Sequence, residues 1–156
     1  MDTLGVSTVL DDVDRRILNE YIEDSRQSYR EIARKLGLSP GTVASRAAKL
    51  EERGIIKRYT VQVDHEKLGY DLTVLVNISV GDAPGFYDGK DHELVELTEP
   101  YAVYHTTGDS DVVVIAKFRT REELSDFTKK LLHKDYIRGT KTQQVLMTLK
   151  EDFNRL

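Results

Sequence analysis

The stretch LGLSPGTVASRAAKLEERG, residues 36–54, decides the fold of the first part of the chain. It contains Gly37, and glycine is the residue most often found just beyond the end of a helix. Ser39 follows, a preferred N-cap, with Pro40 at the first helical position. Two helices joined by such a short turn predict a helix-turn-helix.

The helix that begins after Ser39 has two different faces. Val43, Ala47 and Leu50 have the spacing of the buried stripe of an amphipathic helix. The opposite stripe is polar and carries Thr42, Ser45, Arg46 and Lys49. It is either an ordinary solvated face or a surface that reads a ligand.

Two further helices are predicted before this one. Asp11 or Asp12 can cap the first, and its apolar residues have helical spacing: Val13, Ile17, Leu18 and Tyr21. Ser28 followed by Glu31 is a capping box, which predicts where the second helix begins.

The segment after the third helix, Ile55–Val63, has the composition of a strand and is typical of a winged domain. We therefore expect residues 1–63 to form a winged helix-turn-helix domain that binds DNA. The residues after it, 64–71, are polar and turn-like and are predicted to form a hinge.

The second half of the chain alternates between strand and helix patterns. Strands are predicted at Leu72–Val80, Ala102–Thr107, Val112–Phe118 and Thr140–Leu149, and helices at Pro84–Thr98 and after Thr120. Thr120 and Glu123 form a second capping box. The order βαββαβ is that of a ferredoxin-like domain, here residues 72–156, so the whole chain is predicted to be an α+β protein.

The charge of the chain is unevenly distributed. The net charge is −4 over all 156 residues, but residues 1–63 carry +1 and residues 64–156 carry −5. The segment Arg26–Arg58 holds nine Lys and Arg residues against three acids, a net charge of +6. A basic segment on an acidic chain indicates that one part faces a polyanion and the other does not.

Several classes of protein are excluded by composition. The chain has no cysteine, which excludes disulfides and is compatible with a cytoplasmic protein. Its apolar runs are short, well below the roughly 20 residues of a membrane span, and no signal peptide is visible at the N-terminus. The four histidines show no metal-ligand spacing, so we predict no metal site. No catalytic residue is predicted.

The run Val112–Ala116 is apolar at every position. Because neighbouring residues of a strand point to opposite faces, both faces of this strand carry apolar side chains. A ferredoxin-like sheet has helices on one face, so we expect a second subunit to cover the other. Alternatively, these residues merely follow the preference of strands for β-branched side chains.

Four segments together resemble one known family. They are LDDVDRRIL at 10–18, SYREIARKLGLSPGTVASRAAKLEERGIIKRYTVQVD at 28–64, LGY at 68–70 and TGDSDVVVIAKF at 107–118. Their order and spacing resemble the Lrp/AsnC (leucine-responsive and asparagine regulator) family of bacterial and archaeal transcription factors. The pattern GLSPGTVxxRxxxLExxGII followed by a GDxD turn is more specific than a helix-turn-helix alone.

The resemblance implies an N-terminal domain that binds double-stranded DNA and a C-terminal domain for dimerisation and amino-acid sensing. It implies homodimers that assemble further into tetramers or octamers. It also places a small amino-acid effector near the GDxD turn, here Gly108–Asp111, at an interface between subunits. No cofactor is implied.

The N-terminal part of the third helix of such a domain lies nearest the base edges. The candidates for base contact are Ser39, Gly41, Thr42, Ser45 and Arg46. The candidates for phosphate contact, which give affinity and register, are Arg30, Lys49, Lys57 and Arg58. Gly41 removes a side chain where the helix presses close to DNA. Arg46 either contacts DNA or pairs with an acid of its own domain.

The candidates for effector binding surround the GDxD turn: Tyr104, Thr106, Gly108, Asp109 and Asp111. The carboxylates of this turn can hold the ammonium group of an amino acid. Alternatively, Asp109 and Asp111 are present because hairpin turns favour aspartate, and Tyr104 and Thr106 belong to the core.

We interpret the chain as a sequence-specific DNA-binding transcriptional regulator, not an enzyme, that a small amino acid modulates at subunit interfaces. One alternative is an enzyme similar to the siroheme decarboxylases, which share this architecture, with His105 as the histidine near the pocket. Another is an architectural DNA binder of low specificity. The basic face of the third helix favours a DNA binder over the enzyme.

Overall fold

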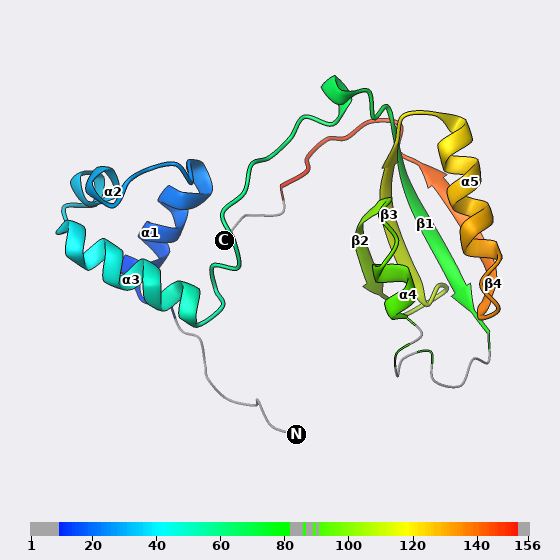
Figure 1. Ribbon diagram of the computed structural model, residues 1–156, viewed down its shortest axis with the longest axis horizontal. Coiled ribbons are helices and arrows are strands. Elements are labelled where there is room, and N and C mark those ends of the chain that lie inside the picture. The colour runs from blue at the N-terminus through cyan, green and yellow to red at the C-terminus, as the bar shows by residue number, and fades with distance from the viewer. Residues whose placement is uncertain (1–9, 82–85, 87–88, 90, 153–156) are drawn as a thin grey trace. The chain divides into compact units, whose positions relative to one another are not determined.

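The computed structural model of the chain describes residues 10–81, 86, 89 and 91–152 (Figure 1). The chain forms two compact units, Met1–Gln62 with Lys150–Leu156, and Val63–Leu149. None of the helices in the described ranges has the length and apolar character that crossing a membrane requires.

Three helices are found among the described residues of the N-terminal unit: α1 (Asp12–Glu23), α2 (Tyr29–Leu36) and α3 (Pro40–Glu52). One apolar core joins them, made of Ile17, Tyr21, Ile32, Ala33, Val43 and Ala47. Gly37 ends α2 in the left-handed region at a φ of 69°, which glycine adopts without strain. The predicted helix-turn-helix is thereby confirmed.

Side-chain caps fix where these helices begin. Of the two acids that could cap α1, Asp11 is the N-cap, and its Oδ1 accepts the N–H of Asp14 at 2.8 Å. Ser28 and Glu31 form the predicted capping box at the start of α2. Ser39 caps α3 with Pro40 behind it, as predicted. Each cap satisfies backbone N–H groups that have no partner within the helix.

The prediction of a strand at Ile55–Val63 is wrong. This segment follows α3 without regular secondary structure, and the side chain of Val61 is 75% exposed. A strand needs a neighbour for its backbone hydrogen bonds, and none of the four strands in the described ranges pairs with this segment. Instead of pairing in a sheet, Ile56 of this segment packs against the helical core.

The C-terminal unit begins with a short 3-10 helix, η1 (Glu66–Leu68), in the predicted hinge. Its regular elements then follow in the order β1 (Leu72–Val80), α4 (His92–Val95), β2 (Pro100–His105), β3 (Val112–Phe118), α5 (Arg121–Leu132) and β4 (Ile137–Gln144). The strands form one antiparallel sheet in the order β2-β3-β1-β4. The predicted βαββαβ order is therefore confirmed.

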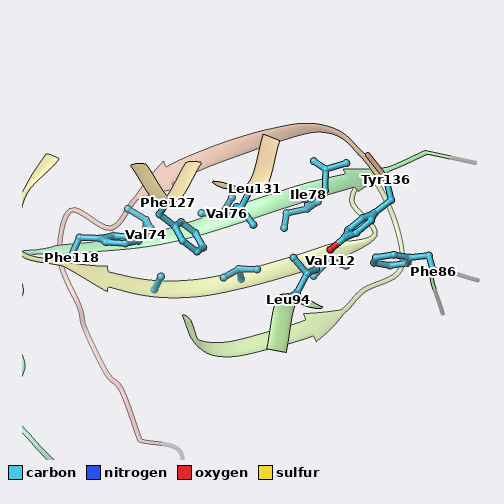
Figure 2. Packing of buried hydrophobic residues seen from close by; sticks show 13 residues of the cluster. Val74, Val76, Ile78, Phe86, Leu94, Val112, Phe118, Phe127, Leu131 and Tyr136 are labelled. Atoms are coloured by element: carbon cyan, nitrogen blue, oxygen red, sulfur yellow. The ribbon is translucent and has the colours of Figure 1, made fainter. Parts of the chain in front are cut away.

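The core of this unit lies between the sheet and its helices (Figure 2). Alternate residues of β1 and β3 are buried on that face: Val74, Val76, Ile78, Val112, Val114, Ala116 and Phe118. α5 covers them with Phe127 and Leu131, both fully buried, and α4 adds Leu94. Thr120 caps α5 as predicted, but the Glu123 carboxylate accepts the N–H of Arg119 instead of that of the cap.

The opposite face of the sheet has no helix over it among the described residues. Val113 and Ile115 of β3 lie on it, next to Leu75 of β1 and Ala102 and Tyr104 of β2. Tyr104 is 47% exposed, and the other four side chains are half-buried. The expectation that β3 carries apolar residues on both faces of the sheet is therefore confirmed.

The helix predicted at Pro84–Thr98 ends earlier than expected. α4 spans His92–Val95, and the three residues after it are not helical. The start of the predicted helix falls largely outside the described residues, which omit 82–85, 87–88 and 90.

Two strands lie earlier in the chain than predicted. They are β2, at Pro100–His105 where Ala102–Thr107 was expected, and β4, at Ile137–Gln144 where Thr140–Leu149 was expected. Apolar residues at the end of the chain suggested a longer final strand. Leu146 and Leu149 are instead 97% and 90% exposed. The pairing of β4 with β1 ends before they are reached.

Candidate nucleic-acid interface and effector turn

A hollow of about 670 Å³ lies beside α3 and the start of α1. Its lining residues are Asp11, Asp14, Ser39, Gly41, Thr42, Ser45, Arg46, Lys49, Leu50 and Arg53. This set includes all six of the residues of α3 and its cap that were predicted to contact DNA. The fold therefore gathers them on one side of the helix.

Ser39 and Thr42 are joined to each other at the start of α3. The Oγ of Ser39 accepts the N–H of Thr42 at 3.0 Å, and the two hydroxyl oxygens are 2.8 Å apart. Each hydroxyl thus has a local partner and a position fixed relative to the helix. Because a hydroxyl both donates and accepts, each can make a further hydrogen bond outward.

Gly41 is not required by the fold of the chain. A Cβ atom at this position would have Ser39 Oγ as its neighbour within 4 Å, at 3.8 Å, which is ordinary van der Waals contact. Its φ lies outside the positive region that favours glycine. Glycine in a helix is less favourable than alanine, and no contact or backbone angle in the described part of the chain requires glycine at this position.

Arg46 is held by two acids of its own unit. Its Nη1 donates to Oδ2 of Asp11 and, at 2.8 Å, to Oδ1 of Asp14. The hydrogen bond from Arg46 is the main cause that lowers the pKa of Asp11, and the same contact raises that of Arg46. The alternative that Arg46 pairs with an acid of its own domain is confirmed, and its contact with DNA stays a prediction.

The other predicted basic residues are exposed: Arg30 on α2, Lys49 on α3, and Lys57 and Arg58 after it. Within the described ranges, none of these four makes an ion pair or a side-chain hydrogen bond. Their charges are available to an anionic partner.

Asp14 and Arg53 were missed as members of this site. Asp14 is 8% exposed, and its Oδ2 lies 4.0 Å from an Nη of Arg53. A signal for Asp14 was present in the sequence, because it shares the helical spacing of Ile17, Leu18 and Tyr21. An acid on the buried face of a helix needs a cationic partner.

The GDxD turn between β2 and β3 is held by hydrogen bonds to the end of β1. Gly108 takes a φ of 108°, which favours glycine. Asp111 Oδ2 accepts the N–H of Val80 at 2.7 Å, and its backbone N–H donates to the carbonyl of Ile78. Asp111 therefore ties the turn to the end of β1, and its part in effector binding stays a prediction.

The remaining candidates around this turn are exposed. The Thr106 hydroxyl donates to the carbonyl of Ser110 at 2.8 Å, so Thr106 supports the turn instead of filling the core. Tyr104 lies on the open face of the sheet, and Asp109 is exposed in the turn. The alternative that Tyr104 and Thr106 belong to the core is wrong, and effector binding here stays a prediction.

His105 has a structural partner. Its Nε2 is 2.9 Å from Oδ2 of Asp91, and this hydrogen bond is the main cause that lowers the pKa of Asp91. Phe86 packs edge-on against the ring of His105. No group of three or more acids and histidines in the described ranges is arranged to hold a metal ion.

Two family models match the chain. Residues 10–57 match a winged helix-turn-helix DNA-binding model, and residues 73–154 match the Lrp/AsnC ligand binding domain. The chain belongs to the Lrp/AsnC family. It is a transcriptional regulator with a helix-turn-helix DNA-binding domain followed by the ligand-binding domain of that family.

Relatives of this Lrp/AsnC protein match it over nearly its whole length. An uncharacterised HTH-type transcriptional regulator of Pyrococcus furiosus is 43% identical over 149 residues, covering 92% of this chain and 96% of that protein. The structure of Escherichia coli AsnC is 28% identical, with a TM-score of 0.84 and coverage of 92% and 97%. A feast or famine regulatory protein of Mycobacterium tuberculosis, complexed with L-methionine, is 28% identical, with a TM-score of 0.83 and coverage of 93% and 97%.

Proposed function

We propose that this Lrp/AsnC regulator reads DNA sequence with α3 in the major groove. Base edges are contacted by the residues at the start and exposed side of the helix: Ser39, Gly41, Thr42 and Ser45. Phosphates are contacted by Arg30, Lys49, Lys57 and Arg58. Phosphate contacts supply affinity and register, whereas contacts to base edges supply specificity.

The exposed polar stripe of α3 is the observation that carries this proposal. Ser45 and Lys49 are exposed one turn apart, and neither side chain has a hydrogen bond or an ion pair among the described residues. Gly41 supports the proposal, because the fold has room for a Cβ atom at this position but the sequence has glycine. On a face that meets solvent alone the missing side chain has no purpose, whereas against a duplex it lets the helix backbone come close.

The proposed working form is a homodimer, assembling further to a tetramer or octamer. The open face of the sheet supports it, since Leu75, Val113 and Ile115 form an apolar strip there. A second copy of the chain carries the same strip and can bury it symmetrically. Such a dimer presents two α3 helices to half-sites that are one helical turn, about 34 Å, or a multiple apart.

The proposed division of labour follows the two halves of the chain. Residues 1–63 bind DNA, 64–71 act as a hinge, and 72–156 dimerise and bind a small amino acid. The effector site is proposed at Gly108–Asp111, between subunits, with the exposed Asp109 holding the ammonium group. The ligand-binding family model and the L-methionine complex of the mycobacterial relative support this choice of ligand. As a DNA-binding regulator, the protein is proposed to act in the cytoplasm.

Selection from a random pool of duplexes tests the DNA-reading proposal. The wild-type protein is expected to enrich a motif with two related half-sites, bound at about 150 mM salt at least a thousandfold more tightly than a scrambled duplex. A flat binding profile would instead support a low-specificity architectural binder. Adding siroheme is expected to leave the absorbance spectrum unchanged, since a shift would favour the enzyme alternative.

A thermal-shift screen of the twenty amino acids tests the effector proposal. A ligand that binds the native state alone raises the melting temperature, by linkage. We expect one or a few amino acids to do so and Asp109→Asn to reduce the shift. A response that survives Asp109→Asn unchanged would place the ammonium elsewhere.

A further inference from the structure

The guanidinium of Arg46 joins α3 to the first turn of α1. Nη1 donates to Asp11, which is the N-cap of α1, and to Asp14, which is in its first turn. The side chain of Arg46 is 31% exposed, and that of Asp14 is 11% exposed. The two acids therefore lie on the α1 side of the guanidinium.

Asp14 makes this contact difficult to give up. Its carboxylate is buried beside the helical core, where an unpaired charge is strongly destabilising. Both cations near it come from the α3 side of the hollow, Arg46 at 2.8 Å and Arg53 at 4.0 Å. Withdrawing Arg46 leaves Asp14 with the more distant and more exposed of the two.

A phosphate contact by Arg46 is disfavoured by the same geometry. The guanidinium already donates through Nη1 to two carboxylates, which offset its attraction for an approaching anion. A phosphate brought to Arg46 approaches Asp11, whose side chain is 53% exposed, and is repelled by it. Lys49, one turn along α3, faces no acid among the described residues and carries no such penalty.

We infer that Arg46 is a positioning residue for DNA recognition and not a DNA contact. Held by Asp11 and Asp14, it fixes the middle of α3 against the start of α1 and so determines where Thr42 and Ser45 meet the base edges. This inference rests on the proposed reading of DNA by α3. Arg46 is thereby removed from the predicted base readers. Asp11 and Asp14 are assigned to positioning α3 and not to contact with DNA.

The dependence of DNA binding on salt separates the two roles of Arg46. Each phosphate contact adds about 0.9 to the slope of log affinity against log salt. Arg46→Gln is expected to keep the wild-type slope while weakening binding to the selected duplex about tenfold, the size of one lost base contact. Its binding to the scrambled duplex stays within about twofold of wild type, because phosphate attraction is unaffected.

Lys49→Gln is the matched control on the same helix. It removes an unpaired exposed charge and is expected to lower the salt slope by about 0.9. The affinities for the selected and the scrambled duplex should fall by the same factor. Asp14→Asn removes the buried partner of Arg46 and is expected to behave like Arg46→Gln, with lower preference for the selected duplex. Asp11→Asn provides a milder variant, because asparagine keeps the N-cap of α1.

Two results would overturn the inference. One is a slope about 0.9 lower in Arg46→Gln. The other is tighter binding of both duplexes by Asp14→Asn with no change in their ratio, as expected if the acid merely restrains a DNA-binding arginine. Partial unfolding of a variant does not confuse the test, since it lowers the active fraction without altering the slope. If selection yields no preferred duplex, the proposed function fails, and the slope on scrambled DNA still decides the role of Arg46.

Discussion

Replacing Gly41 with alanine is expected to make the protein more stable and a weaker DNA binder. The added Cβ meets Ser39 Oγ at 3.8 Å, which is ordinary contact, and the backbone there needs no positive φ. Gly-to-Ala changes at such positions stabilise by about 0.4–1 kcal/mol, chiefly by restricting the unfolded chain. For a unit of this size, that raises its melting temperature by roughly 2–8 °C.

The same methyl group projects from the side of α3 that is proposed to lie against DNA. Filling a close-packed contact with an extra methyl typically costs about 1–3 kcal/mol, so binding is expected to weaken about fivefold or more. The salt slope should not change, because no charge is altered. Fluorescence anisotropy with the selected duplex measures the affinity, and thermal unfolding measures the stability.

Ala48→Gly is the control for helix stability. Ala48 is exposed on α3 but does not line the hollow beside it. The change is expected to destabilise the unit by about 1 kcal/mol while leaving the affinity for DNA within about twofold. The reasoning about Gly41 is refuted if Gly41→Ala binds the duplex as tightly as wild type. A lower melting temperature would show that the chain itself needs glycine there.

Three further perturbations test other parts of the structure. Ser28→Ala removes the hydroxyl of the capping box with Glu31 and is expected to cost about 1 kcal/mol in thermal unfolding, with unchanged dimerisation. Ile115→Glu puts a charge on the open face of the sheet and is expected to give monomers in light scattering with the fold retained, since Ile115 lies outside the buried core. The pKa of Asp11 is lower in the folded chain than its ordinary value of 3.8, so its ionised carboxylate stabilises the fold. This contribution is complete above pH 3.8 and is lost as the pH falls through the folded pKa. The stability advantage of wild type over Asp11→Asn should therefore shrink in acid, and an advantage that grows in acid would contradict the pairing with Arg46.

The helix starts could be predicted because they depend on neighbouring residues. Ser28, Ser39 and Thr120 each accept the backbone N–H three residues ahead, an interaction that sequence spacing alone specifies. β1 and β3 were also predicted with their true bounds. Both are central strands with apolar residues facing a core, and β1 shows this as a period of two, whereas β3 shows it as a short run rich in β-branched residues.

The errors arose where structure depends on distant residues. The segment Ile55–Val63 has strand composition, but forming a strand depends on a neighbour that the segment cannot specify. The partner of Arg46 is likewise set by how α1 packs on α3. The spacing of Asp14 indicates that it is buried and needs a cationic partner, but it does not indicate that the partner is Arg46.

The polar sequence of β4, which made its bounds hard to predict, has a consequence for how copies of this protein associate. β4 is an outer strand of the sheet, and its outer edge exposes backbone groups that could recruit a strand from another molecule. Arg138 and Lys141 are exposed along it, and charged residues at an edge discourage open-ended growth into fibrils. The apolar strip of Leu75, Val113 and Ile115 lies instead on a face of the sheet, on its two central strands. Association through this face is complete once the strip is buried, whereas strand addition at an edge leaves a new edge for the next copy.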